Sequence, residues 1–203
     1  MEIIDCVQGS DEWFNARKGK TTASKADVIL ANGKGLETYI YEIMAEYYSS
    51  EEEEKYTNDA MERGRIIESE ARTIYELETD NIVQQVGFVK YNDYIGCSPD
   101  GLVGEDGLIE IKCPINKTYL IYLLTGEIDK KYYSQMQMQM LITGRSWCDY
   151  VVYHPAFKKN IVIKRVFADK EVQEKLLLSF KIIEEKIKEI KNKMEDSENG
   201  KTE

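Results

Sequence analysis

A dense series of short strand patterns between residues 81 and 114 limits what this chain can fold into. Apolar residues there come in short runs, separated by turn residues such as the Gly-Glu-Asp-Gly sequence at 104–107. This spacing is typical of antiparallel strands joined by tight turns. Before and after this region, apolar residues recur at the three- and four-residue intervals of amphipathic helices. The sequence therefore predicts a mixed α/β fold, in which helices flank a central mixed β-sheet.

The predicted elements follow from these patterns. Helices are expected at about 11–18, 23–31, 36–49, 58–77, 117–124, 130–141 and 170–194. Strands are expected at 82–83, 86–89, 94–97, 100–103, 107–112, 147–153 and 160–166, and the acidic run at 51–54 is expected to be a loop. With 203 residues, the chain should form one domain over 1–194, followed by a polar, disordered tail at 195–203.

Composition excludes several classes of protein. No run approaches the roughly 18 apolar residues that span a bilayer, and the N-terminus is acidic where a signal peptide is basic, so a soluble cytoplasmic protein is expected. The four cysteines are scattered without a CxxC pair, which excludes zinc ribbons and predicts reduced thiols. The single histidine, His154, precedes a proline and is expected on an exposed loop. Catalytic triads and multi-histidine metal centres are therefore excluded.

The charge of the chain does not decide whether it binds nucleic acid. A net charge of −10 argues weakly against such a partner, because nucleic-acid binders usually carry a basic surface. Residues 157–193, however, contain eleven Lys or Arg against six Asp or Glu. The lysine-rich helix predicted there is favoured as a solvated face over a DNA contact.

Three residues around a predicted hairpin carry the strongest chemical signal. Asp100 begins one strand, and the next strand carries Glu110 and Lys112. Residues two apart in a strand point to the same side, so Glu110 and Lys112 face together while Ile109 and Ile111 face the core. The hairpin folds Asp100 back towards them. Two carboxylates and an ammonium group suit metal-assisted hydrolysis with Mg²⁺. The alternative is an exposed cross-strand charge pattern that binds nothing.

Four blocks of sequence resemble one nuclease family, and they occur in the same order as in that family. They are 8–24 (QGSDEW, then Arg17, Gly19 and TAS), 64–72 (GRIIESEAR), 97–102 with 110–114 (CSPDGL and EIKCP), and 132–137 (YYSQMQ). This set resembles the phage lambda exonuclease and YqaJ-type viral recombinase nucleases of the PD-(D/E)xK superfamily. The matches extend over roughly three-quarters of the chain.

The resemblance implies a restriction-endonuclease-like core and a role for each matching residue. Two Mg²⁺ ions, which Mn²⁺ can replace, would be held by Glu68, Asp100, Glu110 and the backbone carbonyl of Ile111. Lys112 would act on the attacking water. The 5′-terminal phosphate would be bound by Arg17, Ser24, Ser98 and Gln135. From the residues alone, Glu68 also suits a solvent-facing helix acid and Ser24 a helix cap.

The resemblance also bears on residues 135–140, where Gln and Met alternate as in a strand. The family match places this run on a helix, with Gln135 and Gln139 on one face. Its methionines are expected to fill the core. Trp13 is likewise expected to be a packing anchor.

The function implied by the resemblance is a metal-dependent 5′→3′ exonuclease that acts on double-stranded DNA ends. It would leave 3′ overhangs for a single-strand annealing protein, assemble as a homotrimer, and come from a phage or prophage in a bacterial cytoplasm. Two alternatives remain: a PD-(D/E)xK endonuclease of restriction or repair type, and a catalytically silent DNA-binding module. Arg17 and Ser24 disfavour the endonuclease, which needs no terminal-phosphate pocket. The intact set of Asp100, Glu110 and Lys112 disfavours the silent module.

Overall fold

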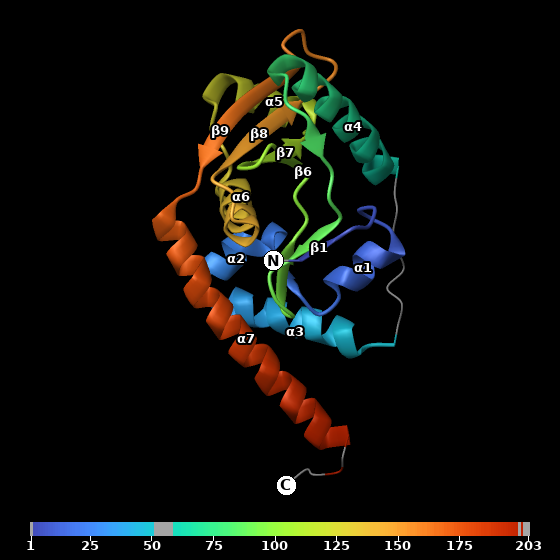
Figure 1. Ribbon diagram of the computed structural model, residues 1–203, viewed down its shortest axis with the longest axis vertical. Coiled ribbons are helices and arrows are strands. Elements are labelled where there is room, and N and C mark those ends of the chain that lie inside the picture. Colours follow the sequence, from blue (N-terminus) through green and yellow to red (C-terminus); the bar gives the residue numbers. More distant parts are fainter. Residues whose placement is uncertain (1, 51–58, 199, 201–203) are drawn as a thin grey trace.

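The computed structural model of the chain describes residues 2–50, 59–198 and 200 (Figure 1). Its helices are α1 (Asp11–Arg17), the 3₁₀ turn η1 (Ala23–Lys25), α2 (Ala26–Ala31), α3 (Lys34–Tyr48), α4 (Asp59–Thr79), α5 (Asn116–Thr125), α6 (Lys130–Thr143) and α7 (Lys170–Glu198). Its strands are β1 (Glu2–Ile4), β2 (Thr21–Thr22), β3 (Val83–Gln84), β4 (Phe88–Lys90), β5 (Ile95–Cys97), β6 (Gly101–Val103), β7 (Gly107–Lys112), β8 (Trp147–Tyr153) and β9 (Ile161–Phe167). The acidic loop predicted at 51–54 lies outside the described residues.

Two mixed sheets form the frame of the fold. The larger has the order β3-β6-β7-β8-β9, with β7 and β8 parallel and the other pairs antiparallel. The smaller has the order β1-β4-β5-β2, with β2 and β5 parallel. The predicted mixed α/β class is confirmed, but β1, β2 and the division into two sheets were not predicted.

Strand β7 lies at the centre of the larger sheet, and both of its faces are covered. It pairs with β8 along its whole length. Ile109 and Ile111 face the cluster that includes Tyr75 of α4, whereas Leu108 faces the cluster that includes the methionines of α6. Ile109 and Ile111 therefore face the core as predicted. The opposite face, which carries Glu110, is also buried.

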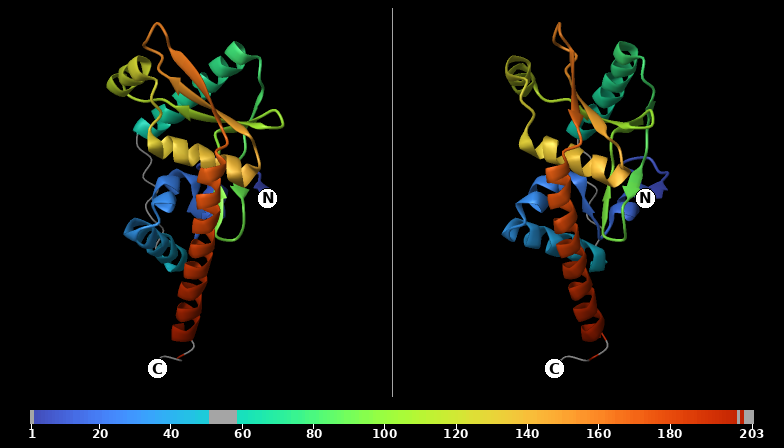
Figure 2. Two further views of the ribbon diagram at one scale, coloured as in Figure 1. Left: turned by 90° about the vertical axis from the view of Figure 1, so that its left-hand side faces the viewer. Right: turned by 60° about the vertical axis from the view of Figure 1, so that its left-hand side comes forward.

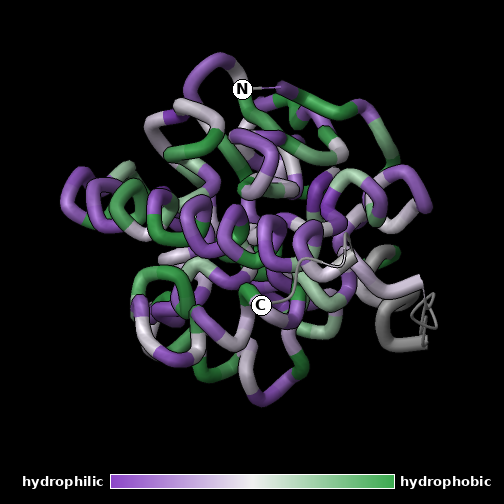
Figure 3. Tube along the Cα trace, turned by 90° about the horizontal axis from the view of Figure 1, so that it is seen from below, coloured by the Kyte–Doolittle hydropathy of each residue, from purple (hydrophilic) through white to green (hydrophobic). Residues whose placement is uncertain are grey.

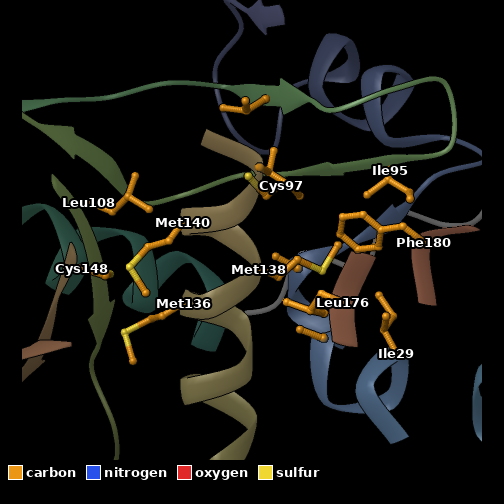
Figure 4. Close-up of a cluster of buried hydrophobic side chains, with 14 of the residues drawn as sticks. Ile29, Ile95, Cys97, Leu108, Met136, Met138, Met140, Cys148, Leu176 and Phe180 are labelled. Carbon is orange, nitrogen blue, oxygen red and sulfur yellow. The ribbon is translucent and has the colours of Figure 1, made fainter. Parts of the chain in front are cut away.

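Helix α6 is buried on most of its surface, which explains its alternating Gln-Met sequence. Met136, Met138 and Met140 are each 0% exposed. Residues two apart on a helix lie about 200° apart around its axis, so they point in nearly opposite directions. Figure 4 shows Met136 and Met140 on the side of Leu108, and Met138 on the side of Leu176 in α7. The helical assignment and the core role of the methionines are thus confirmed.

Helix α7 is longer than predicted and extends beyond the rest of the molecule (Figure 2). Its inner face packs on the core through apolar residues at helical spacing, and hydrophobic and hydrophilic residues alternate along it (Figure 3). The predicted disordered tail is wrong for 195–198, because the helix continues to Glu198. An (i, i+4) ion pair, Lys193 with Glu189 at 2.6 Å, lies in the turns just before this part. None of the described helices, α7 included, is both long and apolar enough to cross a membrane.

The predicted exposure of His154 is also wrong. Its side chain is 4% exposed and packs against the rings of Tyr119 and Phe157, with centroids 5.5 and 5.0 Å away. Its Nδ1 accepts a hydrogen bond from the N–H of Ala156 at 3.2 Å. The histidine is therefore a core residue that closes the turn after β8.

Candidate active site

Two of the carboxylates predicted to be catalytic, Asp100 and Glu110, meet where β6 and β7 pair. The antiparallel register sets Gly101 opposite Ile109, so Asp100 lies beside the Glu110 end of β7. Oδ2 of Asp100 accepts a hydrogen bond from the N–H of Ile111 at 2.6 Å. The hairpin thus places Asp100 next to Glu110 and Lys112.

Glu110 is a fully buried carboxylate that is held by three donors. Lys112 Nζ and Gln135 Nε2 donate to Oε1, the latter at 2.7 Å, and Gln139 Nε2 donates to Oε2 at 2.8 Å. Hydrogen bonds to an ionised acceptor are stronger than neutral ones, and a buried charge needs them. Strand β7 and helix α6 together therefore fix this carboxylate in one orientation.

The electrostatics of the cluster show an excess of negative charge. Burial, then the nearby Glu110, raises the pKa of Asp100 well above its ordinary value, with a further contribution from Glu68 on α4. Burial alone would lower the pKa of Lys112, but Glu110 and Asp100 outweigh it and raise that pKa. Lys112 is therefore protonated at neutral pH. Glu68 also forms an ion pair with Arg72 at 2.9 Å.

A second cluster surrounds Arg17, at the end of α1. Its guanidinium donates to Ser98 Oγ and to Thr22 Oγ1, both at 3.4 Å, and stacks 4.2 Å from the centre of the Trp13 ring. Trp13 Nε1 also donates to Ser98 Oγ at 2.8 Å, and Thr22 Oγ1 lies 3.1 Å from Ser24 Oγ. Burial lowers the pKa of Arg17 from its ordinary value. Burial therefore disfavours this charge, which a bound anion would stabilise.

The two clusters are joined by the segment 98–100. Ser98 belongs to the Arg17 cluster and Asp100 to the carboxylate cluster, with a single residue, Pro99, between them. Gln8 anchors this segment, because its Nε2 donates to the carbonyl of Pro99 at 2.9 Å. The structure thus brings together Arg17, Ser24 and Ser98, whereas Gln135 lies against Glu110.

Several residues of these clusters were not predicted as site residues. Gln139 holds Glu110, Trp13 stacks on Arg17, and Thr22 links Arg17 to Ser24. Two of them follow a rule that can be read from the sequence. Gln139 lies four residues after Gln135 and Trp13 four residues before Arg17, so each pair shares a helix face.

A cavity of about 660 Å³ opens beside Lys112. Its wall includes Tyr122, Tyr132 and Tyr150, and the loop between α5 and α6. The ring of Tyr132 lies 4.9 Å from Lys112 Nζ. The carboxylate cluster therefore has open space on its lysine side.

The oxygen ligands of this site suit a divalent cation such as Mg²⁺. The raised pKa of Asp100 reflects crowded negative charge, which such an ion would relieve. Oε2 of Glu110 accepts one hydrogen bond and keeps a lone pair for an ion. In the part of the chain that the structure describes, no three His, Cys, Asp or Glu side chains form a ready metal site. Mg²⁺ keeps several waters and needs few protein ligands, so Asp100 and Glu110 with the Ile111 carbonyl remain a suitable donor set.

Comparisons with known proteins show which family and which solved structures the chain resembles. The family model for the YqaJ-like viral recombinase domain matches residues 12–146. An alkaline exonuclease from Laribacter hongkongensis, LHK-Exo, is 35% identical, with a TM-score of 0.79 over 92% of this chain and 99% of that chain. The structure of LHK-Exo in complex with dAMP gives the same values.

A more distant solved structure shows the same fold. A phage related exonuclease from Haemophilus somnus 129PT is 14% identical, with a TM-score of 0.62 over 86% of this chain and 96% of that chain. A comparison with curated proteins finds no match. Because the family model spans most of the chain, from α1 to the start of β8, this protein belongs to the YqaJ-like viral recombinase family.

Proposed function

We propose that the chain is a metal-dependent 5′→3′ exonuclease that acts at double-stranded DNA ends and leaves 3′ overhangs. The observation that carries this proposal is that only one residue separates Ser98 of the Arg17 cluster from Asp100 of the carboxylate cluster. A 5′-phosphate bound at Arg17 would leave the adjoining phosphodiesters of its strand near Asp100. Membership of the YqaJ-like family and similarity to exonuclease structures support a nuclease.

The carboxylate cluster would supply the hydrolytic chemistry. Glu68, Asp100, Glu110 and the carbonyl of Ile111 would hold Mg²⁺, which would activate water and neutralise charge on the phosphate. The nearby Glu110 and Asp100 raise the pKa of Lys112, so its ammonium group can orient the water or a phosphate oxygen. Gln135 and Gln139 would keep Glu110 in place throughout.

The Arg17 cluster would select the DNA end. A guanidinium and several hydroxyls are suitable donors to the oxygens of a terminal phosphate. Trp13 fixes the plane of the Arg17 guanidinium from one side, and Thr22 and Ser98 hold it from another. An enzyme that cuts within a strand has no use for such a pocket. The 3′ overhang would then pass to a single-strand annealing protein.

The experiment that tests this function compares linear and covalently closed circular duplex DNA in Mg²⁺, with labels on the 5′ or the 3′ ends. We expect loss of the linear duplex, survival of the circle, and early release of the 5′ label as small products. Chelator should abolish the reaction. Cleavage of the circle would indicate an endonuclease instead, and no cleavage in Mg²⁺ or Mn²⁺ would indicate a binding module.

A further inference from the structure

Near the Arg17 cluster lies a group of three lysines and two tyrosines, here named the basic face: Lys20, Lys188, Lys191, Tyr47 and Tyr94. Lys191 Nζ lies 4.8 Å from the centre of the Tyr47 ring and 5.1 Å from that of Tyr94. Lys188 Nζ lies 5.9 Å from the Tyr94 ring. The ring faces attract the ammonium groups and hold the two lysines on one side of α7.

The charges of the basic face are crowded and poorly neutralised. Burial, and then the positive charges of Lys90 and Lys191, lower the pKa of Lys20, against an opposing contribution from Asp93. Lys90 itself is bound to Asp93 at 2.7 Å. Within the described residues, Lys20, Lys188 and Lys191 form no ion pair with a carboxylate.

Two other lysines of the same helix show the contrast. Lys186 and Lys193 share Glu189, at 3.5 and 2.6 Å, and Lys186 also approaches Glu37 at 3.7 Å. These lysines already have anionic partners. The basic face, in contrast, has only the nearby charge of Asp93, which is itself bound to Lys90, so its lysines are available to an external anion.

The basic face adjoins the Arg17 cluster. Lys20 follows Arg17 by three residues, and its N–H donates to the Arg17 carbonyl at 3.0 Å. The turn between them packs directly on Tyr47, because a Cβ at Gly19 would lie 2.6 Å from that ring. Helix α7 continues from this region away from the molecule (Figure 2). An anion on the basic face would therefore lie near a terminus held at Arg17.

We propose that the basic face binds the phosphodiester backbone of duplex DNA next to the terminus that enters the Arg17 cluster. This inference rests on the proposed exonuclease function and specifies how its substrate is held. Duplex DNA carries about one negative charge per 1.7 Å of its axis, which matches several lysines displayed from one rigid helix and a neighbouring turn. The contact is independent of base sequence, as an exonuclease requires.

The test uses paired double variants of the full chain, with blunt duplex binding measured in EDTA from 50 to 200 mM salt. Lys188→Ala with Lys191→Ala removes two of the proposed contacts, and Lys186→Ala with Lys193→Ala is the matched control. Each phosphate contact contributes about 0.9 to the slope of log affinity against log salt. If two contacts are lost, the slopes differ by about 1.8. When the salt concentration rises fourfold, the affinity of the unsubstituted protein should therefore fall about 12-fold more than that of the Lys188→Ala, Lys191→Ala variant. The control should keep the unsubstituted slope.

The outcomes separate this inference from the function on which it rests. Equal slopes for both double variants would overturn the basic face while leaving the exonuclease intact. Failure of the unsubstituted chain to bind duplex ends would instead contradict the proposed function. Because these lysines are at the surface of α7, unchanged melting temperatures should show that both variants fold.

Discussion

Asp100 occupies a position where its ionised form is unfavourable in the metal-free protein, since burial, Glu110 and Glu68 all raise its pKa. We expect Asp100→Asn to abolish cleavage but to raise the melting temperature of metal-free protein at pH 8. Asn keeps an oxygen for the N–H of Ile111 and removes the charge. A gain of about 1 kcal/mol corresponds to roughly 2–4 °C for a chain of this size. Calorimetry in EDTA measures the shift.

The pH dependence distinguishes this electrostatic effect from a change in packing. A carboxyl whose pKa is raised by folding destabilises the fold increasingly as the pH rises above its unfolded pKa of about 3.9. The stabilisation by Asp100→Asn should therefore be small at pH 4 and larger at pH 8. Mg²⁺ should reduce it, because the ion favours ionised Asp100. An equal gain at both pH values would show that charge is not the cause.

Arg17 gives the second prediction at this scale, which concerns the DNA terminus. A charge-assisted contact to a 5′-phosphate contributes roughly 1.5–3 kcal/mol, so phosphorylated duplex should be degraded about ten- to a hundred-fold faster than 5′-hydroxyl duplex. Arg17→Ala should remove most of this difference by slowing the phosphorylated substrate. Initial rates of two proteins on two substrates form a double-mutant cycle with the phosphate as one partner.

A variant at the carboxylate cluster is the control for that cycle. Lys112→Ala should slow both substrates alike, because Lys112 acts at the scissile bond and not at the terminus. If Arg17→Ala also slowed both alike and lowered the melting temperature, Arg17 would serve only to pack α1 against Trp13 and Ser98. The phosphate pocket would then lie elsewhere.

At the scale of elements, the start of β7 is constrained by its neighbour β8. A Cβ at Gly107 would lie 2.1 Å from the ring of Trp147, which in turn stacks 3.6 Å from the guanidinium of Arg165. Gly107→Ala should therefore destabilise the protein by about 1–3 kcal/mol, as overpacking does in well-packed cores. Urea unfolding measures this loss. Cleavage at low temperature should persist, because Glu110 and Lys112 lie towards the other end of the strand.

Gly64 provides the matched comparison for Gly107. A Cβ there would meet nothing within 4 Å, and the residue lies inside α4. Gly64→Ala should stabilise the protein by up to about 1 kcal/mol through helix propensity. If both substitutions changed stability in the same direction, the crowding by Trp147 would not be the cause.

The elements that could be predicted from sequence are those whose limits are set by residues close to them in the chain. Strand β7 follows a hairpin turn and ends before a proline, so its limits 107–112 were predicted correctly. Strand β2 has two residues and pairs with β5, more than 70 positions away, so no local pattern marks it. The burial of His154 likewise depends on Tyr119, a residue of another element. Such contacts are set by tertiary packing.

The same distinction applies to the candidate site. That Glu110 and Lys112 share a face follows from the strand period alone. That Gln135 and Gln139 donate to Glu110 depends on how α6 packs on the sheet, which the sequence pattern does not specify. The link from Ser98 to Arg17 similarly requires α1 to fold back across the end of β5.

At the scale of the whole molecule, two cationic groups lie next to each other on an acidic chain. The net charge is −10, yet Arg17 and the basic face are adjoining cationic groups. These adjoining cations would attract DNA to the region around the proposed pocket. Such a distribution orients an approaching terminus as well as binding it.

An acidic monomer that holds DNA through a few cations should release it readily, which bears on assembly. We expect the protein to sediment as a homotrimer, with three times the 23.5 kDa mass of one chain, as its family resemblance implies. If the homotrimer forms a ring around the duplex, as the family resemblance also implies, the ring would prevent dissociation without stronger contacts, because the terminus would stay at high effective concentration. Digestion should therefore continue after excess unlabelled duplex is added as a trap, at a salt concentration where binding is weak. A monomeric mass together with immediate arrest by the trap would contradict the ring, while leaving the chemistry at Asp100 and Glu110 untouched.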